Sequence, residues 1–147
     1  MEVVKYSNQG ELESVVRGFQ TLALPFKSWT HEAHMTVAMW YLQRYDPDCA
    51  LQLVRHAIQH FNLANGVVQR PTRGYHETIT VCYMRLVAHF KATLRSDCAE
   101  LERTNALLAS PLAQRQHLLN HYTRDRLMSW EARTGWVEPD LCELPTN

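Results

Sequence analysis

The chain has no excess of either charge and no long apolar run. Lys and Arg together number 15, and so do Asp and Glu. No net field therefore attracts a phosphate backbone or an anionic membrane surface, and neither nucleic acid nor a membrane is an expected partner. Apolar runs such as residues 38–42 are far shorter than the roughly 18 residues that a membrane span needs.

Paired cysteines and a leader pattern are also missing. The four cysteines are widely spaced, without the C-x-x-C pair of a zinc knuckle or a redox dithiol. Residues 1–10 lack the apolar stretch of a secretory signal peptide. We therefore expect a cytoplasmic protein whose thiols are reduced.

Hairpin dipeptides flanked by β-branched runs do not occur, so strands are not expected. Helical periodicity is present instead, with breaks at Gly and Pro. It predicts main helices over about residues 11–20, 31–45, 48–62 and 76–94, capped by Ser28 or Thr30 in the second and by Asp48 in the third. Shorter helices are expected over 98–108, from Ser110 onward, and over 124–133. The sequence predicts one all-α domain over residues 1–147, a helical bundle of four main helices with shorter C-terminal helices and an extended C-terminal strap from residue 136.

Histidines on two of these helices are the sharpest chemical feature. His31 and His34 lie on the apolar side of the second helix, and His76 lies along the apolar stripe of the fourth. Helices two apart in an up-down bundle run parallel, so the three imidazoles are expected at the same end. Three nitrogen ligands suit a divalent transition-metal ion and leave coordination positions open.

Glu77 falls at the edge of the same buried face, where it is expected either as a further metal ligand or as a general base beside a bound water. The alternative is a metal-free polar pocket with structural histidines. The other histidines are expected away from the site, on polar faces: His56, His60, His89, His117 and His121.

A substrate pocket is predicted around the metal. Trp29 and Thr80 lie near the same helix ends, and Arg73 and Tyr75 flank the loop that leads into His76. Tyr41 and Tyr45 are expected as its floor, with plain core packing as the alternative. Trp40 falls on the polar side of its helix, which is compatible with a homodimer.

Three motifs carry a resemblance: W-T-H-E-A-H-M-T-V-A-M-W-Y-L at residues 29–42, G-Y-H-E-T-I-T at 74–80 and W-V-E-P-D-L at 136–141. Together they resemble a family of small, uncharacterised bacterial helical proteins, a resemblance that implies no activity. More loosely, the inward histidines resemble the DinB-like metalloproteins, which use three histidines across two helices and include thiol-dependent transferases. This chain departs from that pattern, because its H-x-x-H pair is on the earlier helix and its single histidine is on the later one. The resemblance is therefore one of architecture, and it implies a three-ligand metal site without implying a particular reaction.

The sequence thus predicts a metal-binding protein that acts as a metal-dependent enzyme on a small molecule. Zinc, iron, nickel and copper all fit the ligand set. Zinc would favour hydrolysis or group transfer, whereas iron or copper would favour oxygen chemistry. The alternative is a non-catalytic module that binds a ligand or a partner, with structural histidines.

Overall fold

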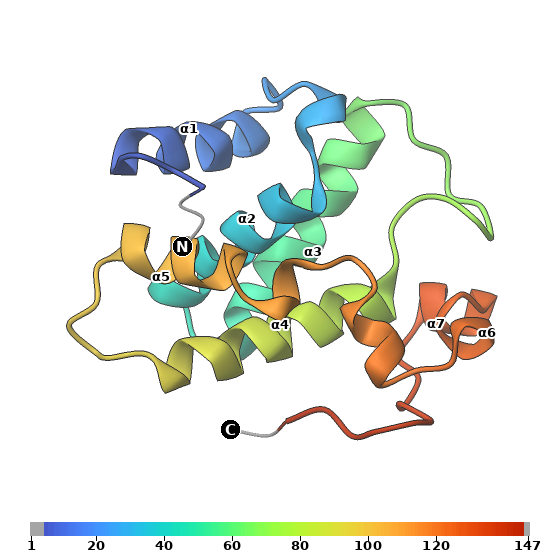
Figure 1. The fold of residues 1–147 in the computed structure, drawn as a ribbon. Helices are drawn as coiled ribbons and strands as arrows, with labels where there is room; N and C mark the ends of the chain where they lie inside the picture. Colours follow the sequence, from blue (N-terminus) through green and yellow to red (C-terminus); the bar gives the residue numbers. More distant parts are fainter. Residues whose placement is uncertain (1–4, 146–147) are drawn as a thin grey trace.

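The computed structural model describes residues 5–145, which are helical with no strand beyond a single bridge between Arg70 and Arg73 (Figure 1). The all-α fold is confirmed. The α-helices are α1 (Gln9–Gln20), α2 (His31–Arg44), α3 (Pro47–Ala64), α4 (Glu77–Thr93), α5 (Glu100–Leu108), α6 (Arg124–Leu127) and α7 (Trp130–Thr134). Three short 3-10 helices join them: η1 (Phe26–Ser28), η2 (Pro111–Ala113) and η3 (His117–Asn120).

Side-chain caps fix where the main helices begin. The Thr30 hydroxyl accepts the N–H of Ala33 and starts α2, as one of the two predicted caps. The predicted cap of α3 is wrong by two residues: Asp46, not Asp48, accepts the N–H of Cys49. The reason is Pro47, which takes the first helical position readily because it has no N–H to leave unpaired there.

The core is organised around α2, which packs against α1, α3, α4 and α5. Its buried residues lie on nearly every side of the helix: Ala33, Met35, Thr36, Val37, Ala38, Met39, Tyr41 and Leu42. A helix that is apolar almost all round belongs inside a domain, not on its surface. Figure 1 shows α2 in the middle of the molecule, between α1 and α4.

The last third of the chain differs most from the sequence-based expectation. The helix predicted from Ser110 is only the 3-10 turn η2, and the helix predicted over residues 124–133 is divided into α6 and α7. Ser129 divides it, because its side chain accepts the N–H of Ala132 and starts a new helix. Residues 135–145 have no regular structure, as predicted for the strap.

The strap and the short helices are tied to α4. Thr78 donates its hydroxyl to the carbonyl of Gly135 at 2.7 Å and accepts the N–H of Val137 at 3.2 Å. Figure 1 shows α6 and α7 at the same end of the molecule as the loop after α3. Among residues 5–145, no helix is long and apolar enough to cross a membrane.

Candidate functional site

The start of α2 presents two imidazoles to a cavity. The Nε2–H of His31 donates to the carbonyl of Leu112 at 3.0 Å, and the Nδ1–H of His34 donates to the carbonyl of Thr30 at 2.6 Å. A carbonyl oxygen only accepts, so these nitrogens carry the protons. The remaining nitrogens, Nδ1 of His31 and Nε2 of His34, have no hydrogen-bond partner among residues 5–145 and hold a lone pair when the ring is neutral.

Both rings are held in place by aromatic neighbours. His34 stacks on Trp29 with ring centroids 3.7 Å apart, and Trp29 stacks on Phe19 at 4.2 Å. His31 meets the ring of Tyr83 edge-on at 4.8 Å. Stacking of this kind orients an imidazole without using its nitrogens.

Burial keeps both histidines neutral. It lowers the pKa of His31, and it lowers the pKa of His34 to about 4. The positive charge of Arg115 acts in the same direction on both rings. At neutral pH each ring is therefore uncharged and keeps one nitrogen that can accept a hydrogen bond or bind a metal.

The cavity beside these rings has a volume of about 770 Å³ and lies between α2, α3, α4 and residues 113–128. Its polar wall contains Lys27, Thr30, His31, Glu32, His34, Thr80, Arg115, Gln116 and Arg124. Most of the rest is apolar: Trp29, Met35, Val37, Ala38, Val54, Ile58, Ile79, Tyr83, Met84, Ala113, Leu118, Leu119, Leu127 and Met128. The cavity is a mostly apolar concave site with a few polar groups, the usual character of a small-molecule pocket.

His76 lies outside this cavity and has a structural role at the start of α4. It is the cap of the helix, not a residue of its first turn as predicted: its Nδ1 accepts the N–H of Ile79 at 3.1 Å. Its Nε2–H donates to the carbonyl of Leu127 at 2.7 Å, so both ring nitrogens are occupied. The side chain is 7% exposed, and burial, together with the nearby charge of Arg133, lowers its pKa.

A register difference between α2 and α4 separates His76 from the other two histidines. His31 packs against Tyr83, which lies seven positions beyond His76 along α4. At 1.5 Å per residue, the start of α4 therefore lies about 10 Å along the helix axis from the position that contacts His31. Helices on the same side of a bundle need not begin at the same level, so the predicted set of three histidines is not brought together.

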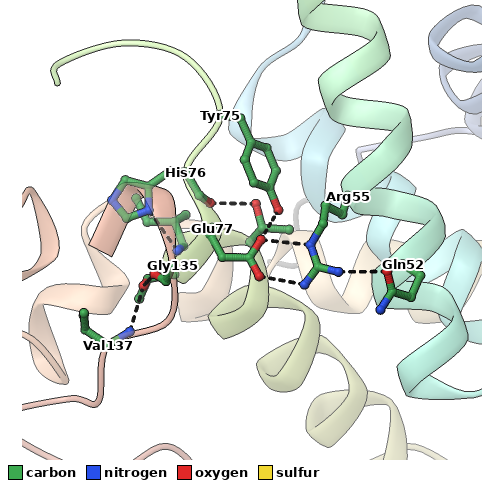
Figure 2. Close-up of polar contacts among 10 residues, drawn as sticks. Gln52, Arg55, Tyr75, His76, Glu77, Gly135 and Val137 are labelled. Carbon is green, nitrogen blue, oxygen red and sulfur yellow. Dashed lines mark hydrogen bonds and ion pairs between the residues drawn. The ribbon is translucent and has the colours of Figure 1, made fainter. Parts of the chain in front are cut away.

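The carboxylate of Glu77 accepts hydrogen bonds from two other side chains, and it lies outside the cavity beside His31 and His34. Its carboxylate accepts Nε–H and Nη2–H from Arg55 at 2.9 and 2.6 Å, and the hydroxyl of Tyr75 at 2.6 Å. Figure 2 shows this group, with His76 pointing away from it. Burial alone would raise the pKa of Glu77, but the hydrogen bonds from Arg55 and Tyr75 outweigh burial and lower it. A carboxylate held as an anion this way is poorly suited to act as a base near pH 7.

The residues predicted to form the substrate pocket likewise do not all line one cavity. Trp29 and Thr80 line the cavity of about 770 Å³. Tyr41 and Tyr45 lie at the other end of α2, outside that cavity, where the Tyr41 hydroxyl accepts from Gln20 and Tyr45 is 42% exposed. Tyr41 packs in the core, which is the alternative that the sequence left open, whereas Tyr45 only stacks on the outer side of Tyr41, with ring centroids 6.0 Å apart.

The two predicted pocket residues of the loop before α4, Arg73 and Tyr75, lie outside the first cavity. Arg73 is exposed, and its backbone pairs with that of Arg70 in a tight turn. Tyr75 lines a second cavity, together with Glu77. Trp40 is partly buried against the core, with the guanidinium of Arg44 3.9 Å above its ring.

Within residues 5–145, no group of three or more His, Cys, Asp or Glu side chains is placed to hold a metal ion. The metal site built from His31, His34, His76 and Glu77 stays a prediction. Its strongest remaining part is the pair on α2, since the nitrogens of His76 and the oxygens of Glu77 already have protein partners.

The other histidines fall partly as expected. His56 and His60 are exposed, as expected for residues on a polar helix face. His117 is closer to the site than the sequence indicated: burial lowers its pKa, and the neighbouring rings of His121 and His31 act in the same direction.

Sequence reasoning missed five cationic residues that line the cavities. Lys27, Arg115 and Arg124 line the first cavity, and Arg55 and Arg133 line the second. Three lie in the C-terminal third, where helical turns are too short for periodicity to show which side chains face inward. An arginine in W-E-A-R-T carries no signal that it is buried.

Comparisons with protein families, with curated proteins and with solved structures found no significant match to this chain. The two resemblances drawn from its motifs stay predictions. The function therefore has to be argued from the site itself.

Proposed function

We propose that the protein binds a small organic anion with an apolar body in the cavity beside His31 and His34. The observation that carries this proposal is the charge balance of the cavity wall. The wall contains three cationic side chains, Lys27, Arg115 and Arg124, and one carboxylate, Glu32. Glu32 itself lies 3.6 Å from the amino group of Lys5. The wall therefore has an excess of positive charge, which favours an anionic ligand.

The position of these charges suggests how the ligand would be oriented. Lys27, Arg115 and Arg124 are exposed, so they belong to the mouth of the cavity. Apolar residues make up most of the rest of the wall, among them Met35, which is buried, and Ile79, which is half-buried. A carboxylate or phosphate at the mouth would stay partly hydrated while the apolar body is removed from water, which is the cheaper way to bind a charged molecule.

The two imidazoles add a specific requirement. Because each is neutral and its donor nitrogen is used, the free nitrogen of His31 and of His34 can only accept. The best ligand would therefore carry a hydroxyl or N–H group within its apolar part. A ligand without such a donor would leave a buried acceptor unpaired and bind more weakly.

The test is a titration with medium-chain and aromatic carboxylates and phosphate monoesters, each beside its uncharged analogue, followed by calorimetry and by NMR of the histidine rings. The anions should bind and shift the signals of His31 and His34. The double variant Arg115→Gln and Arg124→Gln should lose about tenfold in affinity, as expected for two exposed charges.

Arg95→Gln is the control, because Arg95 is exposed and its guanidinium pairs with Asp97 at the surface. It should leave affinity unchanged. Equal binding of anions and uncharged analogues, or equal losses in the double variant and the control, would refute the proposal.

The metal-dependent enzyme is the second candidate, and the pair His31 and His34 supports it. Each keeps one ring nitrogen without a protein partner, and two imidazoles at i and i+3 can begin a metal site whose other ligands come from substrate or water. Metal analysis of protein purified without a histidine tag tests it. One transition-metal ion per chain that is lost in both His31→Gln and His34→Gln would support this function, whereas a metal-free protein with intact anion binding would reject it.

A further inference from the structure

A second cavity, of about 620 Å³, lies between α3, the loop after it and α7, and it shares no residue with the first. Its wall consists of Arg55, Gln59, Asn62, Leu63, Val67, Gln69, Tyr75, Glu77, Arg133 and Thr134. Two arginines and one glutamate are its charged groups. How each arginine is neutralised decides what the cavity can bind.

Arg55 is neutralised within the protein. Two of its nitrogens donate to the two oxygens of Glu77, the paired geometry that matches a guanidinium to a carboxylate (Figure 2). The same carboxylate also accepts the Tyr75 hydroxyl. Glu77 therefore has little capacity left to compensate another cation.

Arg133 has no such partner, although it is only 7% exposed. Its Nε–H and one Nη1–H donate to the carbonyls of Pro71 and Gly74, at 3.1 and 2.9 Å. No carboxylate among residues 5–145 forms an ion pair with it, and burial alone lowers its pKa. A guanidinium has five N–H donors, so three remain available, both of those on Nη2 included.

The hydrogen bonds from Arg133 to the carbonyls of Pro71 and Gly74 hold the loop before α4 in place, but the two carbonyls do not neutralise the charge of Arg133. A buried cation without a counter-ion is costly, since carbonyl dipoles replace only part of the lost hydration. Arg133 also lines an open cavity, so a counter-ion can reach it from solvent. The loop is built for close approach, because Gly74 has φ near +102° and a Cβ there would lie 2.4 Å from the Gln69 amide oxygen.

We propose that this second cavity binds a small oxyanion, a carboxylate or a phosphate, through the donors of Arg133 that Pro71 and Gly74 leave unused. The amides of Gln59 and Asn62 supply further N–H donors on the wall. Because the anion would sit against the residue that holds the 67–77 loop, its binding should also slow hydrogen exchange in that loop.

The probes are inorganic phosphate, acetate and, as an ionic-strength control, chloride, titrated against the whole chain with NMR detection of the arginine Nε–H signals. Phosphate or acetate should give a saturable shift at Arg133 and chloride should not. A response to phosphate alone would assign a phosphate ligand, and a response to acetate would assign a carboxylate.

Gln59→Glu tests the site without touching the bonds of Arg133. Gln59 is exposed on α3 and lines the cavity, so the variant is expected to fold. Its carboxylate would repel the anion or pair with Arg133, and either effect should weaken binding about tenfold. Asn120→Asp makes the same change in charge at an exposed position outside both cavities, and it should have no effect.

Absence of a saturable shift at Arg133 with either oxyanion would overturn the proposal, as would equal weakening in Gln59→Glu and Asn120→Asp. Shifts confined to Arg115 and Arg124 would also overturn it while supporting the first cavity. The two proposals can therefore fail separately.

Discussion

The starts of α2 and α4 look alike in sequence but are used differently. Each has a histidine followed by a glutamate, in T-H-E and Y-H-E. At α2 the hydroxyl of Thr30 caps the helix, and His31 and His34 keep a free nitrogen beside a cavity. At α4 the cap is His76 itself, and no ring nitrogen is left over.

The difference lies in which residue satisfies the helix terminus. A helix leaves its first N–H groups unpaired, and some acceptor must meet them. Where a threonine precedes the histidine, the hydroxyl does this and the imidazole is available for other chemistry. Where Tyr75 precedes it, the imidazole supplies the acceptor. The chemical availability of a histidine near a helix start therefore depends on its neighbour.

The largest expected effect comes from breaking the α4 start. His76→Ala removes the cap of α4, the bond to the Leu127 carbonyl and a buried ring, so it should lower the free energy of unfolding by about 2–4 kcal/mol. His76→Asn should recover about 1 kcal/mol of this, because asparagine is a good N-cap. Urea denaturation measures both, and a loss below about 0.5 kcal/mol in His76→Ala, typical of a surface site, would contradict the structural role of His76.

The pH dependence of stability follows from the same comparison. The pKa values of His31, His34 and His76 are lowered in the folded protein, so the unfolded chain takes up protons first as pH falls. Their contribution to stability is complete above the unfolded-state value of about 6.5 and is lost as pH falls through the folded-state values, for His34 down to about 4.

Each unit of lowering corresponds to about 1.4 kcal/mol at most, before solvent screening reduces it. Denaturation between pH 7.5 and 4 checks this. The decline should be smaller in His34→Gln and His76→Asn than in the wild type, whereas His56→Gln should follow the wild type. A flat profile, or equal slopes in all variants, would show that these rings are not buried as neutral groups.

Sequence reasoning was accurate for the first two helices, whereas it placed the cap of α3 two residues too late. The apolar periodicity over residues 11–20 and the cap at Thr30 depend on neighbours along the chain, and the structure has both: α1 buries Leu12, Val16 and Phe19, and Thr30 caps α2. Arg133 and the division between α6 and α7 depend instead on contacts with residues about sixty positions away or on a single serine cap. These features leave no periodic signal.

For the site, the sequence identified the residue types but not their grouping. His31, His34, Trp29 and Thr80 do line one cavity. His76 and Glu77 do not, because the relative level of two helix starts is decided by packing, here by His31 against Tyr83. Spacing within a helix gives direction, but it cannot give the register between helices.

A smaller effect is expected at the α2 start. Thr30→Ala removes the hydroxyl that accepts the Ala33 N–H and should cost about 1 kcal/mol, while Thr30→Ser should cost little. Since His34 also bonds the Thr30 carbonyl, the loss of the cap should shift the NMR signals of the His34 ring but leave those of His76 unchanged. Denaturation and ring NMR of the two variants provide the measurement. Equal changes at His34 and His76 would mean that the two helix starts are not independent.

The smallest effect is expected on α3, where His56 and His60 have the i, i+4 spacing that binds zinc in other helices. Both are exposed, and the shallow surface around them offers Ala57, Gln59 and Leu63 but no third ligand. Replacing both by Gln should change the free energy of unfolding by less than about 0.5 kcal/mol and leave metal content and anion binding as in the wild type. Metal analysis and calorimetry on the double variant test this. A loss of bound metal there, with His31→Gln and His34→Gln unaffected, would move the histidine chemistry of this protein from the start of α2 to the surface of α3.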